Sequence, residues 1–273
     1  MKRITAILSI LILIIMHSIS YASAKPTGLL ILGDSISTGY GLDGYVKGSE
    51  NREIASFSNL LSRSLGCFND NNYKNLASDG KTTDELLEAI KASPSTYSEY
   101  QYISVTIGGN DLLDTILPSL MTTLDDFSAE DIYGGKIIGK IQNFNGELSK
   151  QIDMTINHAS KNIDETLKLL RQYNPDSFIV IQTVYNPFDG RDNKLFSYIN
   201  ERIINPSINK LNDSIKESAK KYEVYVADIN SVFKGNEDKY TNINKFDIHP
   251  SSKGHLKILD IIQKSVNQYQ SKK

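Results

Sequence analysis

The stretch GLLILGDSIS, at residues 28–37, joins a short apolar run to a polar turn that begins with glycine. An apolar run of this length without polar alternation is typical of a strand covered on both faces, as in a parallel sheet. Ligands of open parallel sheets bind beyond the carboxyl ends of the strands. Ser35 follows such an end directly, so the sequence places it where functional groups gather.

Four more apolar runs follow, of which the first is the weakest: residues 73–77, 102–107, 177–184 and 224–229. Helical patterns separate or flank them at residues 54–65, 83–92, 148–170, 206–221 and 255–267. In the clearest one, apolar residues recur at spacings of three and four from Leu148 to Leu170, which places them on one helical face. This alternation predicts an α/β domain, a three-layer α/β/α sandwich around a central parallel five-stranded sheet.

The N-terminus carries the pattern of an export signal. A positively charged start precedes an apolar run at residues 7–16, and the small residues ASA at 22–24 suit a signal peptidase. The run is short for a membrane span of about 20 residues. We therefore expect a signal peptide at residues 1–24 and one domain at residues 25–273. We also expect a secreted or extracytoplasmic protein, free or associated with the cell wall, with no stable membrane anchor.

Composition excludes several classes of protein. The formal net charge is −2 and no basic stripe is present, which argues against a nucleic-acid partner. Cys67 is the only cysteine, so no internal disulfide can form. The chain has neither a CxxC nor an HExxH motif, and its histidines are scattered. We expect neither a metal nor a cofactor.

An extra excursion lies between the third apolar run and the clearest helix, at residues 112–148. It is either a loop with a short helix that covers the sheet edge or a cap over a functional site. Long loops in compact domains are often functional, so both interpretations stay open.

Ser35, in Gly33-Asp34-Ser35, occupies a strand-to-helix turn. Such a turn can present both the serine Oγ and its own N–H to a reacting group. The alternative is an ordinary turn or a helix N-cap. The nearby GxGxxG at residues 39–44 is not a dinucleotide fingerprint, because that motif must form the strand-to-helix turn itself. We expect those glycines to form a loop beside Ser35.

Two further turns offer hydrogen-bond donors. Asn110 follows the strand at residues 102–107, and its carboxamide can donate to a developing oxyanion. The alternative is a cap for the next helix. Gly80 follows the weak strand, where its N–H could be another donor or the glycine could simply make a turn.

Three histidines follow the predicted signal. His158 lies on the flank of the amphipathic helix and His255 in the last helical stretch, whereas His249 lies in a loop before a proline. The unperturbed pKa of histidine suits a general base, and His249 is the best candidate to take a proton from Ser35. Asp247 could fix the tautomer of its ring.

Together these blocks, GDS, a glycine, GxND and a histidine before the last helix, resemble the SGNH hydrolase superfamily, also called the GDSL-like lipases and esterases. The resemblance implies a flavodoxin-like three-layer fold. It also implies Ser35 as nucleophile and His249 as base. The oxyanion donors it implies are the N–H groups of Ser35 and Gly80 and the side chain of Asn110.

The resemblance has one departure. The family places its acid three residues before the histidine, where this chain has Phe246, while Asp247 lies only two before it. Asp247 could still reach the ring through a different turn. A Ser–His dyad oriented by a backbone carbonyl, or a distant acid such as Asp228, would serve instead. We favour Asp247. The segment YNPF at residues 185–188 resembles the Gram-positive secreted members.

The leading hypothesis is thus a secreted serine carboxylic ester hydrolase that acts on acyl esters or lysophospholipids through an acyl-enzyme, with a small-molecule or lipid ester as its partner. An O-deacetylase of cell-wall or other glycans is the second hypothesis, and a catalytically decayed surface-binding module is the third. An acyl-chain enzyme needs an apolar groove. The candidates for its lining are Leu112, Leu113, Ile116, Leu117 and Phe188.

Overall fold

The computed structural model describes residues 28–49, 51–125, 136–189 and 194–272. Its sheet has five parallel strands in the order β2-β1-β3-β4-β5. Their bounds are Leu29–Gly33 (β1), Tyr73–Asn75 (β2), Tyr102–Thr106 (β3), Phe178–Gln182 (β4) and Tyr225–Ala227 (β5). Each lies within or overlaps a predicted apolar run, which confirms the predicted sheet. The predicted signal peptide lies outside the described residues.

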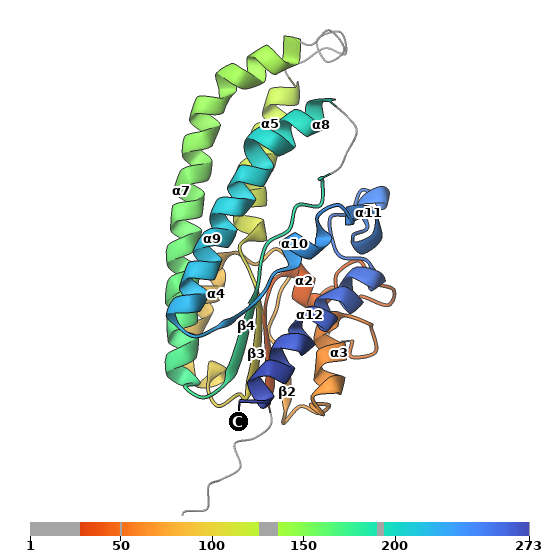
Figure 1. The fold of residues 1–273 in the computed structure, drawn as a ribbon, viewed down its shortest axis with the longest axis vertical. Helices are drawn as coiled ribbons and strands as arrows, with labels where there is room; N and C mark the ends of the chain where they lie inside the picture. The colour runs from red at the N-terminus through yellow and green to blue at the C-terminus, as the bar shows by residue number, and fades with distance from the viewer. Residues whose placement is uncertain (1–27, 50, 126–135, 190–193, 273) are drawn as a thin grey trace, which may run out of the picture.

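Helices cover both faces of the sheet (Figure 1). Leu29 and Ile31 face a core built with α3 (Phe57–Ser64) and α12 (Ser252–Gln270). Leu30 and Leu32 face the opposite core, whose main helices are α4 (Thr83–Ala92), α7 (Lys136–Tyr173) and α9 (Asn205–Lys221). Both faces of the strands are therefore buried, and the three-layer α/β/α fold is confirmed.

Several short elements complete the chain. They are α2 (Ser35–Thr38), η1 (Pro94–Tyr97), α10 (Ile229–Phe233), α11 (Glu237–Tyr240) and η3 (Ile243–Lys245). Within the described ranges, none of the helices combines the length and apolarity that crossing a bilayer requires.

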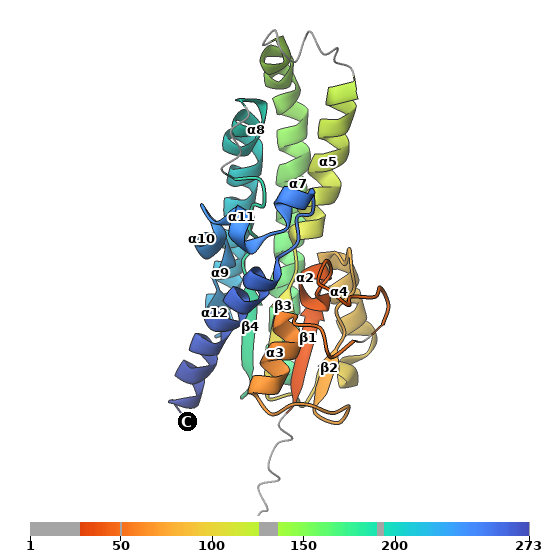
Figure 2. The same ribbon diagram turned by 90° about the vertical axis from the view of Figure 1, so that its right-hand side faces the viewer.

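A helical extension rises beyond the carboxyl edge of the sheet (Figures 1 and 2). It is formed by α5 (Gly109–Asp125), the first half of α7, and α8 (Lys194–Ile199), which continues through the π-helical turn η2 (Asn200–Ile204) into α9. The excursion predicted at residues 112–148 is therefore mainly helical, apart from residues 126–135, which lie outside the description. A helix predicted to begin at Leu148 begins at Lys136, because packing against α5 continues it beyond the sheet.

Candidate active site

The turn after β1 presents Ser35. Gly33 has a φ of +123°, and a Cβ there would lie 1.8 Å from the carbonyl oxygen of Thr106 on β3, so only glycine fits. Asp34 then caps α2 by accepting a hydrogen bond from the Ile36 N–H at 3.0 Å. Ser35 is consequently the first residue of α2 and lies above the end of the strand.

Asp34 is buried beneath this turn. The Thr106 hydroxyl donates to its carboxylate at 2.9 Å, and the Asp34 N–H lies 3.3 Å from the same hydroxyl oxygen. Burial raises the pKa of Asp34, although the hydrogen bond from Thr106 opposes that shift. The turn that carries Ser35 is thereby fixed to β3 as well as to β1.

His249 lies opposite Ser35 on a loop closed on itself. The Asn242 N–H donates to the His249 carbonyl at 2.9 Å, and Thr241 and Pro250 form an antiparallel bridge. His249 Nε2 lies 2.9 Å from Ser35 Oγ, and its Nδ1 lies 2.5 Å from Asp247 Oδ1. Because Asp247 can only accept when ionised, Nδ1 carries the proton and Nε2 is free to accept from Ser35.

The spacing of the acid is accommodated by a local turn. Phe246 has a φ of +58°, in the left-handed region that a phenylalanine rarely adopts. Asp247 Oδ1 also accepts from the backbone N–H of His249 at 3.0 Å, as in an Asx turn. Asp228, the distant acid considered above, is held by Lys216 at 2.9 Å and Thr183 at 3.1 Å instead.

The two other predicted site residues, Gly80 and Asn110, lie in the turn after β2 and at the start of α5. Gly80 occupies a turn closed by a hydrogen bond of 3.1 Å from the Lys81 N–H to the Ser78 carbonyl, and its φ is +75°. Asn110 lies in the first turn of α5, with its Nδ2 donating to the Lys81 carbonyl at 2.9 Å. Ser35, Gly80, Asn110 and His249 all line one cavity.

This cavity has a volume of about 580 Å³ and is lined by Ser35 and by residues of α5, α8, η2 and α9. Most of its wall is apolar. From α5 come Leu112, Leu113, Ile116 and Leu117; the segment after β4 adds Val184, Pro187 and Phe188; and the helix from α8 to α9 adds Ile199, Ile204 and Ile208. All five residues expected from the sequence to line an acyl groove are among them.

The π-helical turn shapes this wall. The Asn205 N–H donates to the Asn200 carbonyl, five residues back, just before a proline that has no N–H to give. Asn186 reaches the turn through its Nδ2, which donates to Asn205 Oδ1 at 2.9 Å, and Asn200 Nδ2 donates to the Phe188 carbonyl at 2.6 Å. These amides fix the apolar residues of η2 against the segment after β4.

A scan against known families identifies the chain. The model of the GDSL-like lipase/acylhydrolase family matches residues 31–257, which include every residue placed at the site above. This chain belongs to the GDSL-like lipase/acylhydrolase family. It is accordingly an ester-hydrolysing enzyme with the SGNH hydrolase fold.

Solved structures show the same fold. A lipase from a goat rumen metagenome has a TM-score of 0.60 and 20% identity, over 87% of this chain and 96% of that one. A phospholipase A1 from Streptomyces albidoflavus has a TM-score of 0.60 and 20% identity, over 88% and 99%. An acetylxylan esterase from Geobacillus stearothermophilus has a TM-score of 0.54 and 13% identity, over 88% and 95%. No curated protein matches the chain.

Nothing in the sequence indicated that two tyrosines of this GDSL-like hydrolase contact the His249 loop. The Tyr40 ring contacts the His249 ring at a tilt of 38°, with centroids 4.3 Å apart, and Tyr40 also lines the cavity. The Tyr185 hydroxyl donates to the Ile248 carbonyl at 2.7 Å, which holds the His249 loop against the segment after β4. The sequence predicted that residues 39–44, which include Tyr40, form a loop beside Ser35. It did not predict either tyrosine contact, because both join segments far apart in the sequence.

The two other histidines that the structure describes, His158 and His255, lie away from the Ser35–His249 pair. His158 Nε2 pairs with Asp84 at 2.8 Å on the surface. His255 is fully buried, accepts from the Phe57 N–H at 3.2 Å through Nδ1, and has its pKa lowered to about 3 by burial. Among the described residues, no group of three or more His, Cys, Asp or Glu side chains could hold a metal ion.

Proposed function

We propose that this hydrolase cleaves esters of medium or long acyl chains, with Ser35 as nucleophile and His249 as general base. The observation that carries the proposal is the apolar cavity of about 580 Å³ that begins at the Ser35–His249 hydrogen bond. Ligand pockets of about 300–1,000 Å³ that are mainly apolar suit molecules far larger than an acetyl group.

The chemical steps follow from the geometry. Ser35 Oγ attacks the ester carbonyl while His249 Nε2 takes its proton, and the protonated His249 then gives that proton to the leaving alkoxide. Water attacks the resulting acyl-enzyme by the reverse path. Asp247 keeps the Nδ1–H tautomer and stabilises the imidazolium that forms in both steps.

The tetrahedral oxyanion lies among three donors in this proposal: the N–H groups of Ser35 and Gly80 and the Nδ2 of Asn110. Removing one such donor in other enzymes costs about 3 kcal/mol of transition-state stabilisation. The Asn110 Nδ2 has a second hydrogen available, because its bond to the Lys81 carbonyl uses one of two.

The acyl chain occupies the space between α5 and the helix from α8 to α9. Residues of α5, such as Leu113 and Leu117, line the cavity, so we propose that this part of the 112–148 excursion forms a cap over the active site. Similar structures include both a phospholipase A1 and an acetylxylan esterase. The apolar wall favours an acyl or phospholipid ester over the sugar of a glycan O-deacetylase.

The test is hydrolysis of p-nitrophenyl acetate, butyrate, octanoate and palmitate by residues 25–273, with Ser35→Ala as the inactive control. We expect kcat/KM to rise from acetate to octanoate and activity to vanish in Ser35→Ala. A preference for acetate would overturn the acyl-chain assignment, and full activity of Ser35→Ala would overturn the serine mechanism. We also propose export. When the full-length chain is expressed, the protein recovered from the medium should begin at Lys25.

A further inference from the structure

The three proposed oxyanion donors belong to three different elements. The Ser35 N–H lies at the start of α2, the Gly80 N–H lies in the turn closed by Ser78 and Lys81, and Asn110 lies in the first turn of α5. Donors stabilise an oxyanion only within about 2.7–3.1 Å of it. Some feature of the chain must therefore fix the separations between these elements.

Asp79 ties the Gly80 turn to the nucleophile helix. Thr38 Oγ1 donates to Asp79 Oδ1 at 2.6 Å, and the Tyr45 hydroxyl donates to Asp79 Oδ2. Thr38 Oγ1 also lies 3.1 Å from the Ser35 carbonyl oxygen, so the contact reaches the nucleophile's own peptide. Burial, together with the hydrogen bond to Asp79, raises the pKa of Tyr45 to about 12, which keeps its hydroxyl a donor.

The hydrogen bonds to Asp79 act on the Asp79–Gly80 peptide, which carries the N–H of Gly80. Gly80 has a φ of +75° at the third position of its turn, and the orientation of the Asp79–Gly80 peptide distinguishes a type II turn from a type I turn. A flip of that peptide would turn the Gly80 N–H away from its present direction. Holding both carboxylate oxygens of Asp79 restrains the residue on one side of this peptide.

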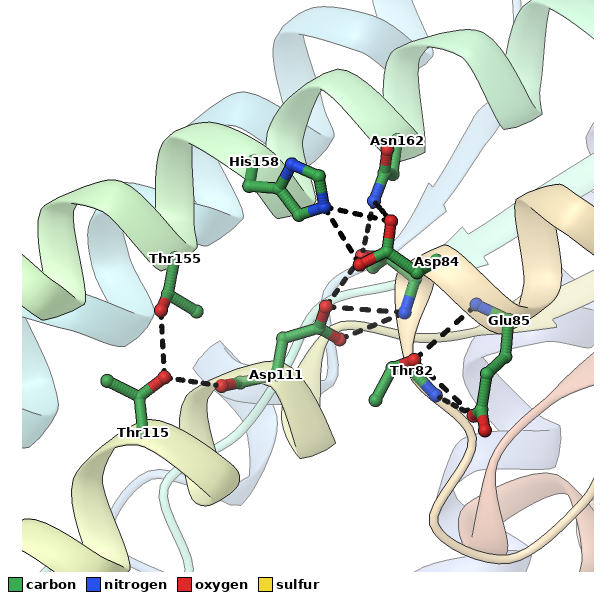
Figure 3. Close-up of polar contacts among 9 residues, drawn as sticks. Thr82, Asp84, Glu85, Asp111, Thr115, Thr155, His158 and Asn162 are labelled. Atoms are coloured by element: carbon green, nitrogen blue, oxygen red, sulfur yellow. Dashed lines mark hydrogen bonds and ion pairs between the residues drawn. The ribbon is translucent and has the colours of Figure 1, made fainter.

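Asp111 makes the corresponding tie on the other side of the turn. Its Oδ1 accepts from Thr83 Oγ1 at 2.6 Å and its Oδ2 from the Thr83 N–H at 3.1 Å, so the first turn of α5 is joined to the start of α4. Figure 3 shows the carboxylate of Asp111 directed toward this end of α4. Asp111 follows Asn110, and Thr83 is separated from Gly80 by only Lys81 and Thr82.

The direction of the Thr83 hydroxyl is determined by a third helix. Asn162, on α7, donates its Nδ2 to Thr83 Oγ1 at 3.2 Å and to Asp84 Oδ1 at 2.9 Å (Figure 3). Because Asn162 can only donate from this nitrogen, the proton of Thr83 is left to bond with Asp111. His158 then pairs with Asp84 at 2.8 Å at the surface end of the network.

We propose that Asp79 and Asp111 are positioning residues of the oxyanion hole, which hold its three donors at fixed separations through the hydroxyls of Thr38 and Thr83. The proposal rests on the proposed function of this site. Neither aspartate touches the reacting atoms in it. They act through Gly80 and Asn110.

The test replaces each threonine by valine, which keeps the shape and removes the hydroxyl. We expect Thr38→Val and Thr83→Val each to lower kcat on p-nitrophenyl octanoate by about 10- to 100-fold with KM nearly unchanged, because small misplacements of catalytic groups have effects of this order. Thr38→Ser and Thr83→Ser should restore kcat. Thr155→Val, at the α5–α7 contact with Thr115, is the matched control and should keep the wild-type kcat.

A second measurement separates positioning from stability. An alkylboronic acid forms a tetrahedral adduct on the serine, and its Ki should rise in proportion to the loss of kcat/KM in both valine variants. Active-site titration gives kcat per folded molecule. If that value and the Ki equal those of wild type, the contacts are merely structural and the proposal is wrong. If Ser35→Ala retains turnover, the proposed function falls, and the proposed positioning roles fall with it.

Discussion

Asp247 Oδ1 accepts two hydrogen bonds from one residue, His249: one from the backbone N–H at 3.0 Å and one from the ring Nδ1 at 2.5 Å. This double contact orients the ring relative to its own backbone. It explains how a carboxylate two residues before the histidine reaches the ring, although the resemblance noted from the sequence implies an acid one residue earlier. Phe246, which is exposed and has a left-handed backbone conformation, occupies the position that the resemblance assigns to the acid.

Replacing Asp247 by asparagine tests this pair. The amide can present its Nδ2 to the ring, which favours the wrong tautomer, and in a related triad this change lowers kcat by about 10⁴-fold. We expect a loss of about 10³- to 10⁴-fold for Asp247→Asn in steady-state assays. Asp228→Asn should stay within about threefold of wild type, and a larger loss in that variant would identify Asp228 as the acid.

A larger side chain in the cavity should change the preference for acyl-chain length. Leu113 lines the cavity from α5, so Leu113→Trp should shorten the space for the acyl chain. We expect kcat/KM for octanoate to fall by at least about tenfold, in keeping with 1–3 kcal/mol per mismatched group, while acetate changes little. Met154→Trp, at an exposed position on α7, is the control. An unchanged chain-length profile in Leu113→Trp would place the acyl chain elsewhere.

Tyr40 is expected to restrain the His249 ring. Its ring contacts the His249 ring at a tilt of 38°, with centroids 4.3 Å apart, and Tyr40 is 39% exposed, so its substitution leaves the core intact. Tyr40→Ala should lower kcat by about fivefold, corresponding to the ~1 kcal/mol of an aromatic pair, while Tyr40→Phe stays close to wild type. Stopped-flow measurement of acylation checks this, and equal rates for both variants would argue against a role of the Tyr40–His249 ring contact.

The burial of His255 should make the fold less stable in acid. Its pKa is lowered to about 3 by burial. Below pH 6.5, the ordinary pKa of histidine, this residue is therefore protonated in the unfolded chain but stays neutral in the folded chain until about pH 3. The free energy of unfolding should therefore fall with decreasing pH between about 6.5 and 3, by at most about 1.4 kcal/mol per pH unit.

His255→Asn keeps an acceptor for the Phe57 N–H and removes the titrating ring. Urea denaturation from pH 7 to 4 should show a shallower decline of stability in this variant than in wild type. His158→Asn, which changes an exposed histidine, is the control. Parallel pH profiles for His255→Asn and wild type would contradict the prediction.

The strands and α4 followed from local signals. Apolar runs marked the strands, and α4 begins at the predicted residue because Thr82 and Glu85 form a capping box. Such signals need no knowledge of the tertiary structure. The positions of Ser35, Asn110 and His249 beside the sheet were equally predictable, since each follows a strand or precedes a helix in a recognisable motif, and their catalytic roles stay predictions.

The helical extension followed from no local signal. Pro118 lies inside α5 although proline disfavours a helix interior, and contact with α7 overrides its propensity. The same holds for η2, where a π turn precedes Pro206. The Thr38–Asp79 and Thr83–Asp111 contacts join distant segments, so no spacing in the sequence reveals them.

The unbroken course of α7 limits how this enzyme can diversify. Leu148 and Ile152 precede Leu167 and Leu170 along α7, and all four side chains belong to one buried core. Inserting a single residue between these two pairs would rotate one relative to the other by about 100°. Variation in acyl-chain preference by changes in length is thus confined to loops or to whole helical turns, and side-chain size on α5 and η2 remains the gradual route.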